Sequence, residues 1–152
     1  MNEIAIQDQY DDQAQVCYGC GPKNEQGLQL KSYQRDDKVF AEYTARPQEQ
    51  GFEGFVYGGL VASLVDCHAM ATAANNAKLR LQLEEMPRYV TGALTVNYKK
   101  PTPLSKEPIK LVAQVVEYSE RKAIVKLEVS VDRVVTAEGD VVAVRIPDSM
   151  KI

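Results

Sequence analysis

The chain has 152 residues, a hydrophobic fraction of 45% and a net charge of −3 at pH 7, which suffices for one domain with its own core. Its basic residues form no block, which argues against nucleic-acid binding. The first residues show no pattern of a secretion signal, and no apolar run is long enough to span a membrane, so we expect a cytoplasmic protein without a membrane partner.

The first third of the chain predicts short elements separated by loops. Alternation of apolar and polar residues marks the strands, and glycine and proline mark the loops. The predicted elements are a flexible or helical tail over 1–15, a loop over 17–27, strands over 28–33 and 39–44 joined by a polar turn at 35–38, and a loop over 47–54.

The central segment, residues 54–76, is apolar on nearly every face and begins with the glycine pair Gly58 and Gly59. A helix that is hydrophobic all round is buried, so this segment predicts a central helix. Residues 77–87 either extend that helix or form a second short one. One carboxylate, Asp66, lies in the middle of the central segment. An ionised group is costly there unless it is paired, hydrogen-bonded or faces a cavity.

The last third predicts long strands over 90–98, 109–118, 123–131 and 134–146, the last one shortened to 141–146 if residues 138–140 form a tight turn. No β-α-β alternation is present, which argues against a parallel sheet. We therefore predict a single α+β domain over 1–152, in which an antiparallel sheet of five to six strands wraps around one long central helix. The uncovered parts of such a sheet favour a homodimer or a dimer of dimers.

Three cysteines cannot all pair internally, and two of them, Cys17 and Cys20, have the two-residue spacing of zinc and redox sites. A zinc ribbon needs a second pair, and only Cys67 and His68 remain. A redox motif would lie between a strand and a helix, but a turn follows Cys20. The sequence therefore favours small residues of a structured loop over a metal site, and it favours packing over nucleophilic chemistry for Cys67.

Three blocks in this order resemble the hotdog-fold acyl-CoA thioesterases, of the phenylacetate-pathway and 4-hydroxybenzoyl-CoA thioesterase types. The blocks are CYGCGPKNEQGLQL (17–30), QGFEGFVYGGLVASLVDCHAMATAA (50–74) and RYVTGALTVNYKKPTPL (88–104), and with the later strands the resemblance covers residues 16–147. Many members have His-Gly-Gly where this chain has Tyr57-Gly58-Gly59, and some have an asparagine at the position of Gly51. The Tyr-Gly-Gly form resembles a recurring variant of the family.

The resemblance implies hydrolysis of an acyl-CoA or acyl-carrier-protein thioester, with no cofactor and no metal. A free N–H at a helix N-terminus polarises a carbonyl, and Gly59 has this position. Asp66 acts as a general base for water or as a nucleophile. Seven residues of helix separate the two by about 10 Å, so both cannot serve one thioester from the same helix. The family's shared site implies that Gly59 of one subunit faces Asp66 of the other.

Two residues near Asp66 have open roles. Thr91 aligns with a serine or threonine that holds the attacking water in some members, and its alternative role is a β-branched residue suited to a strand. His68 is a substrate-binding candidate, but it points about 200° away from Asp66 around the helix. A hydrogen-bonded core histidine, or one that reaches the partner chain, is the alternative.

The remaining candidates bind the substrate. Tyr57 either donates its hydroxyl near the thioester carbonyl or lines the pocket, next to Gly58. Arg88, Lys99 and Lys100 either meet the phosphates of coenzyme A or are ordinary surface charges.

Two other functions fit the sequence less well. A catalytically silent hotdog protein that binds an acyl thioester or another apolar ligand would explain the absent histidine and asparagine, but not Asp66. A hydratase would pair an aspartate with a histidine, and the helical phase of Asp66 and His68 opposes it.

Overall fold

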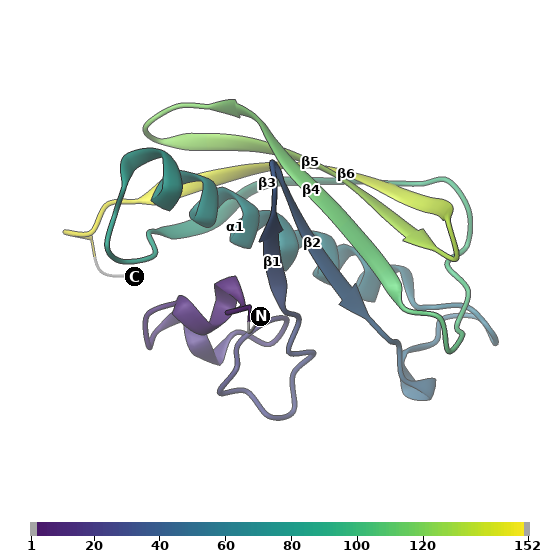
Figure 1. Ribbon diagram of the computed structural model, residues 1–152. Coiled ribbons are helices and arrows are strands. Elements are labelled where there is room, and N and C mark those ends of the chain that lie inside the picture. Colours follow the sequence, from purple (N-terminus) through teal and green to yellow (C-terminus); the bar gives the residue numbers. More distant parts are fainter. Residues whose placement is uncertain (1–2, 151–152) are drawn as a thin grey trace.

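One long helix lies against one face of a six-stranded antiparallel sheet in the computed structural model, which describes residues 3–150 (Figure 1). The helix and strands are α1 (Gly58–Leu81), β1 (Ser32–Arg35), β2 (Lys38–Tyr43), β3 (Arg88–Tyr98), β4 (Ile109–Tyr118), β5 (Lys122–Val131) and β6 (Val134–Ile146). The strand order is β1-β2-β4-β5-β6-β3. The predicted α+β arrangement, with six strands around one helix, is confirmed.

Helix α1 is buried because its surface is apolar and small. Leu64, Val65 and Ala69 are each 0% exposed, and the helix contacts β1, β3, β4, β5 and β6. It continues past the asparagines at 75 and 76 to Leu81, so the extension is the correct alternative. Gln82 then ends the helix in the left-handed conformation (φ 53°), and its N–H donates to the Lys78 carbonyl.

Strand β6 runs unbroken from Val134 to Ile146, so the tight turn considered for residues 138–140 is wrong. Gly139 lies instead where the strand crosses the helix. A Cβ at Gly139 would lie 2.7 Å from Val65 Cγ1 and 3.0 Å from Leu127 Cδ2. The glycine therefore allows the sheet to approach α1 closely.

The strand predicted over 28–33 is wrong for most of its length, because β1 begins only at Ser32. Leu28 and Leu30 are 7% and 1% exposed, which accounts for the alternation. Their N–H groups donate to the carbonyls of Tyr18 and Gly19, so they pair with the cysteine-containing loop and not with a strand. Alternating burial here reflects a loop packed on the core.

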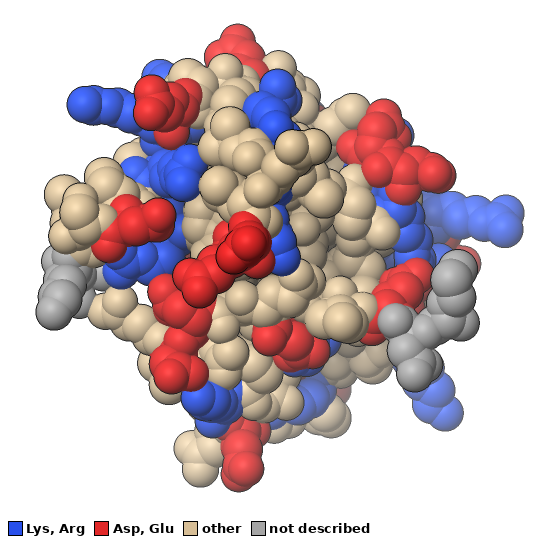
Figure 2. Space-filling view, turned by 60° about the vertical axis from the view of Figure 1, so that its left-hand side comes forward, with Lys and Arg blue, Asp and Glu red and all other residues tan. Residues whose placement is uncertain are grey.

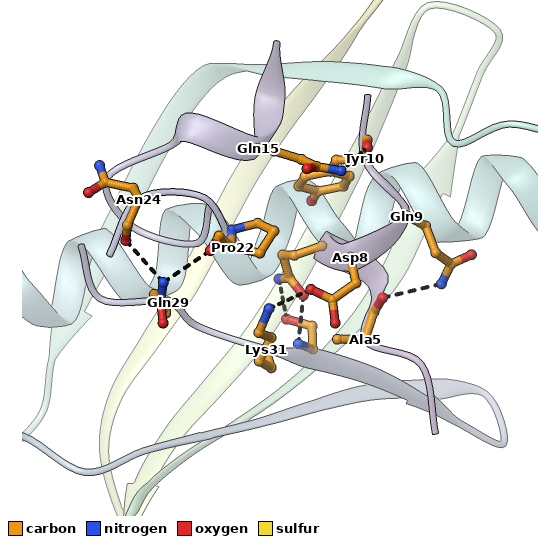
Figure 3. A network of polar contacts seen from close by, with 11 residues as sticks. Ala5, Asp8, Gln9, Tyr10, Gln15, Pro22, Asn24, Gln29 and Lys31 are labelled. Atoms are coloured by element: carbon orange, nitrogen blue, oxygen red, sulfur yellow. Dashed lines mark hydrogen bonds and ion pairs between the residues drawn. The ribbon is translucent and has the colours of Figure 1, made fainter. Parts of the chain in front are cut away.

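The segment before the cysteine loop contains two short 3-10 helices, Ile6–Gln9 and Ala14–Val16, where the sequence predicts a flexible or helical tail. Ile6 and Gln7 are buried. Figure 3 shows the polar contacts that tie this segment and the following loop to the domain, among them the ion pair of Asp8 with Lys31 and the bonds from Gln29 Nε2 to two loop carbonyls. The N-terminal segment is thus a packed part of the fold.

Strand β3 is an edge strand, since it pairs only with β6. Leu94, Val96 and Tyr98 share one face of it, and this face points to α1 because Val96 packs on the core. Leu94 and Tyr98 are nevertheless 39% and 53% exposed. A long edge with exposed apolar side chains is a surface for pairing with another strand.

The remaining surface carries charges of both signs. Figure 2 shows acidic and basic side chains intermixed on the face it presents, without a large area of one sign. No helix within residues 3–150 combines the length and apolar character that a bilayer-spanning segment needs.

Candidate active site

Asp66 and Thr91 meet across the space between α1 and β3. The Thr91 hydroxyl donates a hydrogen bond to Asp66 Oδ1. Both residues line a cavity of about 360 Å³ between the helix, the start of β3 and the N-terminal segment. The carboxylate at the middle of the apolar helix is therefore both hydrogen-bonded and open to a cavity, which removes the cost that its position implies.

The N-terminus of α1 forms a second cavity at the other end of β3. Tyr57, Gly58, Lys99 and Lys100 line it together with Tyr98. The Tyr98 hydroxyl donates to the Gly58 carbonyl at 2.7 Å and so fixes the start of the helix to the end of the strand. The N–H groups of Leu60 and Val61 donate to the Tyr57 carbonyl at 3.0 and 3.2 Å, so the N–H groups of Gly58 and Gly59 are the candidate donors at this helix start.

Gly59 is the second residue of the helix, and the ring of Tyr57 lies over it. A Cβ at Gly59 would meet the ring and hydroxyl atoms of Tyr57 at 2.4–2.8 Å. The glycine is therefore required for this ring position, independently of any role of its N–H. Tyr57 itself is 59% exposed, so its ring can move to uncover Gly59.

The structure does not bring Gly59 and Asp66 of one chain to the same cavity. Asp66 lines the cavity at the start of β3, whereas the neighbours of Gly59 line the cavity at its end. The two groups have the separation of about 10 Å that seven helical residues give.

His68 lies in the core and lines neither of these two cavities. It is 0% exposed, Ser32 Oγ lies 2.8 Å from Nδ1, and Nε2 lies 3.0 Å from the Val39 carbonyl oxygen. A carbonyl can only accept, so Nε2 carries the proton and Nδ1 accepts from Ser32. Burial lowers the pKa of His68 to about 4. This placement corresponds to the hydrogen-bonded core histidine, one of the alternatives that the sequence left open.

The three basic candidates have different surroundings. Arg88 lines the Asp66 cavity, but its guanidinium donates to Gln13 and to the carbonyls of Pro147 and Met150. It therefore ties the segment around Gln13 and the segment after β6 to β3. Lys99 lies 3.8 Å from Glu138, and Lys100 is exposed. Only the two lysines border the cavity at the helix N-terminus.

The three cysteines converge at the wall of the Asp66 cavity. Cys17, Cys20 and Cys67 all line it, and their Sγ atoms lie within 4.8 Å of one another. Hydrogen bonds from the Cys20 and Cys67 thiols lower the pKa of the Cys17 thiol far below its ordinary value. Hydrogen bonds to Cys17 and to Cys20, with burial, raise the pKa of Cys67. A separate hydrogen bond between Cys20 and Cys17 raises the pKa of Cys20 to about 12.

Sequence reasoning missed this cluster. Its signal was the pair Cys17 and Cys20 together with a third cysteine next to Asp66, but the loop that joins them has no strand or helix whose period could place it. The contact of Tyr98 with Gly58 was missed for the same reason, since a strand pattern does not say which helix residue lies beside it.

The chain is similar in structure to several solved proteins. A thioesterase superfamily protein from Shewanella loihica is 36% identical, covers 91% of this chain and is itself covered in full, with a TM-score of 0.70. The PaaI protein of the phenylacetic acid degradation operon of E. coli is 17% identical. The match covers 79% of this chain and 81% of the PaaI chain, with a TM-score of 0.65. Also 17% identical is a phenylacetic acid degradation-related protein from Ralstonia eutropha, described as a putative thioesterase. The match covers 77% of this chain and 85% of that protein, with a TM-score of 0.63.

The last two likenesses concern the fold alone, and with the first they confirm the predicted hotdog fold. No family model and no curated protein matches the chain.

Proposed function

The chain belongs to the thioesterase superfamily, and from this membership we propose that it hydrolyses acyl thioesters of coenzyme A or of acyl carrier protein, with Asp66 as the general base or nucleophile. The observation that carries the proposal is the contact between Asp66 and Thr91 at a cavity wall. A carboxylate at the middle of an apolar helix needs a hydrogen-bond partner or a cavity, and Asp66 has both, since it faces a cavity of about 360 Å³.

The Thr91 hydroxyl orients the carboxylate. By donating to Oδ1, it fixes the carboxyl plane and leaves Oδ2 to take a proton from water or to attack the thioester carbon. In the first case the water attacks the carbonyl carbon, the carbon–sulfur bond breaks, and the proton held by Asp66 passes to the departing thiolate. In the second, Oδ2 attacks the thioester carbon, the carbon–sulfur bond breaks and the thiolate leaves, taking a proton from water. Water then hydrolyses the acyl-aspartyl anhydride, which releases the acid and restores the Asp66 carboxylate.

The carbonyl oxygen of the thioester needs a hydrogen-bond donor close to Asp66. The Gly59 N–H of the same chain is too far away, so we infer that a dimer supplies it. If the exposed edges of two β3 strands pair antiparallel about a twofold axis at Thr95, and the irregularity at Gly92 takes up one residue, Thr91 of one chain lies opposite Tyr98 of the other. Thr91 holds Asp66 and Tyr98 holds the start of the helix. The Asp66 cavity of one subunit then adjoins the Gly59 N–H of the partner subunit.

In this arrangement the Gly59 N–H polarises the thioester carbonyl from the helix N-terminus. The Tyr57 ring must move from its position over Gly59 to admit the carbonyl, and its hydroxyl is then next to the reacting group. Lys99 and Lys100 border the same cavity, and this position supports the proposal that they bind the phosphates of coenzyme A.

A panel of short, medium, long and aromatic acyl-CoAs tests the activity. Thioester loss is followed by ultraviolet absorbance, because thiol reagents would also react with the three cysteines. We expect turnover of at least one class and a decrease of about 10²- to 10⁴-fold in Asp66→Asn, with unchanged folding by circular dichroism. Equal turnover by Asp66→Asn would exclude Asp66 as the base or nucleophile.

One observation favours a second function, the binding of an acyl thioester without hydrolysis. The Tyr57 ring covers Gly59. Many family members have a histidine in place of Tyr57, directly before the glycine pair. If the ring stays there when a ligand binds, the carbonyl cannot reach the Gly59 N–H. Saturable binding of acyl-CoA without turnover of any substrate, in both wild type and Tyr57→Ala, would establish this function in place of hydrolysis.

A further inference from the structure

The cysteine cluster joins two segments that are far apart in sequence. Cys17 and Cys20 lie in the loop after the second 3-10 helix, and Cys67 lies on α1 directly after Asp66. Cys20 is 4% exposed, and the other two are partly buried. All three thiols line one cavity wall, and no disulfide joins them.

The sulfur positions fit a single ion. Two thiolates bound to one tetrahedral zinc ion at about 2.3 Å lie about 3.8 Å apart. The Sγ atoms of Cys17 and Cys67 are 3.8 Å apart, and all three sulfur atoms lie within 4.8 Å of one another. The cluster therefore needs only small side-chain adjustments to place three sulfurs at bonding distance from one point.

The backbone around the cluster leaves room for the three sulfur atoms. A Cβ at Gly19 would lie only 2.3 Å from Cys67 Sγ, so the glycine leaves the space that the Cys67 thiol occupies. The loop is closed by the Gly21 N–H, which donates to the Cys17 carbonyl at 2.8 Å.

We propose that Cys17, Cys20 and Cys67 bind one zinc ion, whose fourth coordination position faces the Asp66 cavity. Three thiolates favour a soft or borderline metal ion over magnesium or calcium. Zinc with three thiolates has a net charge of −1, whereas Cu(I) would leave −2 beside the Asp66 carboxylate. Binding displaces the thiol protons to solvent. A zinc ion with three protein ligands keeps an open position for water or a small ligand.

The test does not depend on thioesterase activity. The full chain, reduced with a phosphine and freed of metal by a chelator under argon, is titrated with Co²⁺, whose thiolate charge-transfer absorbance reports sulfur ligands, and the bound Co²⁺ is then displaced with Zn²⁺. We expect one ion per chain, and we expect Zn²⁺ to raise the melting temperature because it binds the folded state.

Substitutions separate coordination from folding. Cys20→Ser and Cys67→Ser should lose the charge-transfer absorbance while circular dichroism remains unchanged. Gly19→Ala keeps all three thiols but pushes against Cys67, so it should weaken Zn²⁺ binding by about 10- to 100-fold. Tyr18→Phe is the matched control, because Tyr18 lies between the two loop cysteines and is 62% exposed, and it should bind Zn²⁺ as the wild type does.

Absence of the charge-transfer absorbance in reduced, folded protein would overturn the proposal, as would an absorbance that persists unchanged in Cys67→Ser. If mass spectrometry finds a disulfide in the purified protein and the protein still binds no Zn²⁺ after reduction, the cluster is a redox pair with a third thiol and the zinc site is refuted.

Discussion

Replacing Thr91 by valine removes one hydrogen bond and little else. Thr91 donates to Asp66 Oδ1, and valine keeps the β-branched shape that suits a strand. A hydrogen bond to a charged group contributes about 1.5–3 kcal/mol, and partial replacement by water lowers this value because Thr91 is exposed. We expect a loss of about 1.4 kcal/mol in transition-state stabilisation, which is about a tenfold decrease in kcat.

The assay compares kcat and KM of wild type, Thr91→Val and Thr91→Ser on the best acyl-CoA of the panel. Serine restores the hydroxyl, so Thr91→Ser should recover most of the lost kcat, and KM should change little in both variants. A Thr91→Val enzyme with wild-type kcat would refute an orienting role. Equal losses in the serine and valine variants would show that Thr91 acts only through strand packing.

Three further predictions concern the fold and the dimer. Gly139→Ala should lower the free energy of unfolding by about 1–3 kcal/mol in urea titrations, because its Cβ would press on Val65; an unchanged midpoint would contradict the close approach. Burial opposes ionisation of Glu49, but hydrogen bonds from the side chain and backbone of Arg46 outweigh it and lower its pKa below 4.5. The stability deficit of Glu49→Gln should therefore be full near neutral pH and shrink as the pH falls below about 4.5; a deficit independent of pH would count against the ionised pair. Leu94→Arg should yield a folded monomer in sedimentation and abolish turnover, and an active dimer would exclude the β3 edge as the interface.

The fold could be predicted because its pattern is long and regular. Strand β4 has the predicted bounds, Ile109–Tyr118, because β-forming residues fill it and a polar turn follows. Its register shift against β5 between Val115 and Glu117 was not predicted. The all-round apolar helix had one consistent explanation, burial against a sheet. The strand prediction fails where side chains are buried without strand pairing of the backbone. Leu28 and Leu30 alternate with polar residues as in a strand, but they cover the core from a loop.

The site was predictable in its residues and not in its geometry. A carboxylate in an apolar helix identified Asp66, and the resemblance identified Thr91, but only the packing of β3 on α1 brings their side chains together. Helical phase showed that His68 points away from Asp66, whereas its burial depends on Ser32 and Val39 from other elements. The convergence of three cysteines depends on an irregular loop, for which sequence periodicity gives no position.

The most direct test of the shared site compares two heterodimers, each isolated with two affinity tags. In the first, one chain carries Gly59→Val and the other Asp66→Ala; in the second, one chain carries both substitutions and the other none. A site built from Gly59 of one subunit and Asp66 of the other leaves one intact site in the first heterodimer and none in the second. We therefore predict about half of the wild-type turnover for the first and background turnover for the second. The reverse result would contradict the account, because it would place the whole site within one chain.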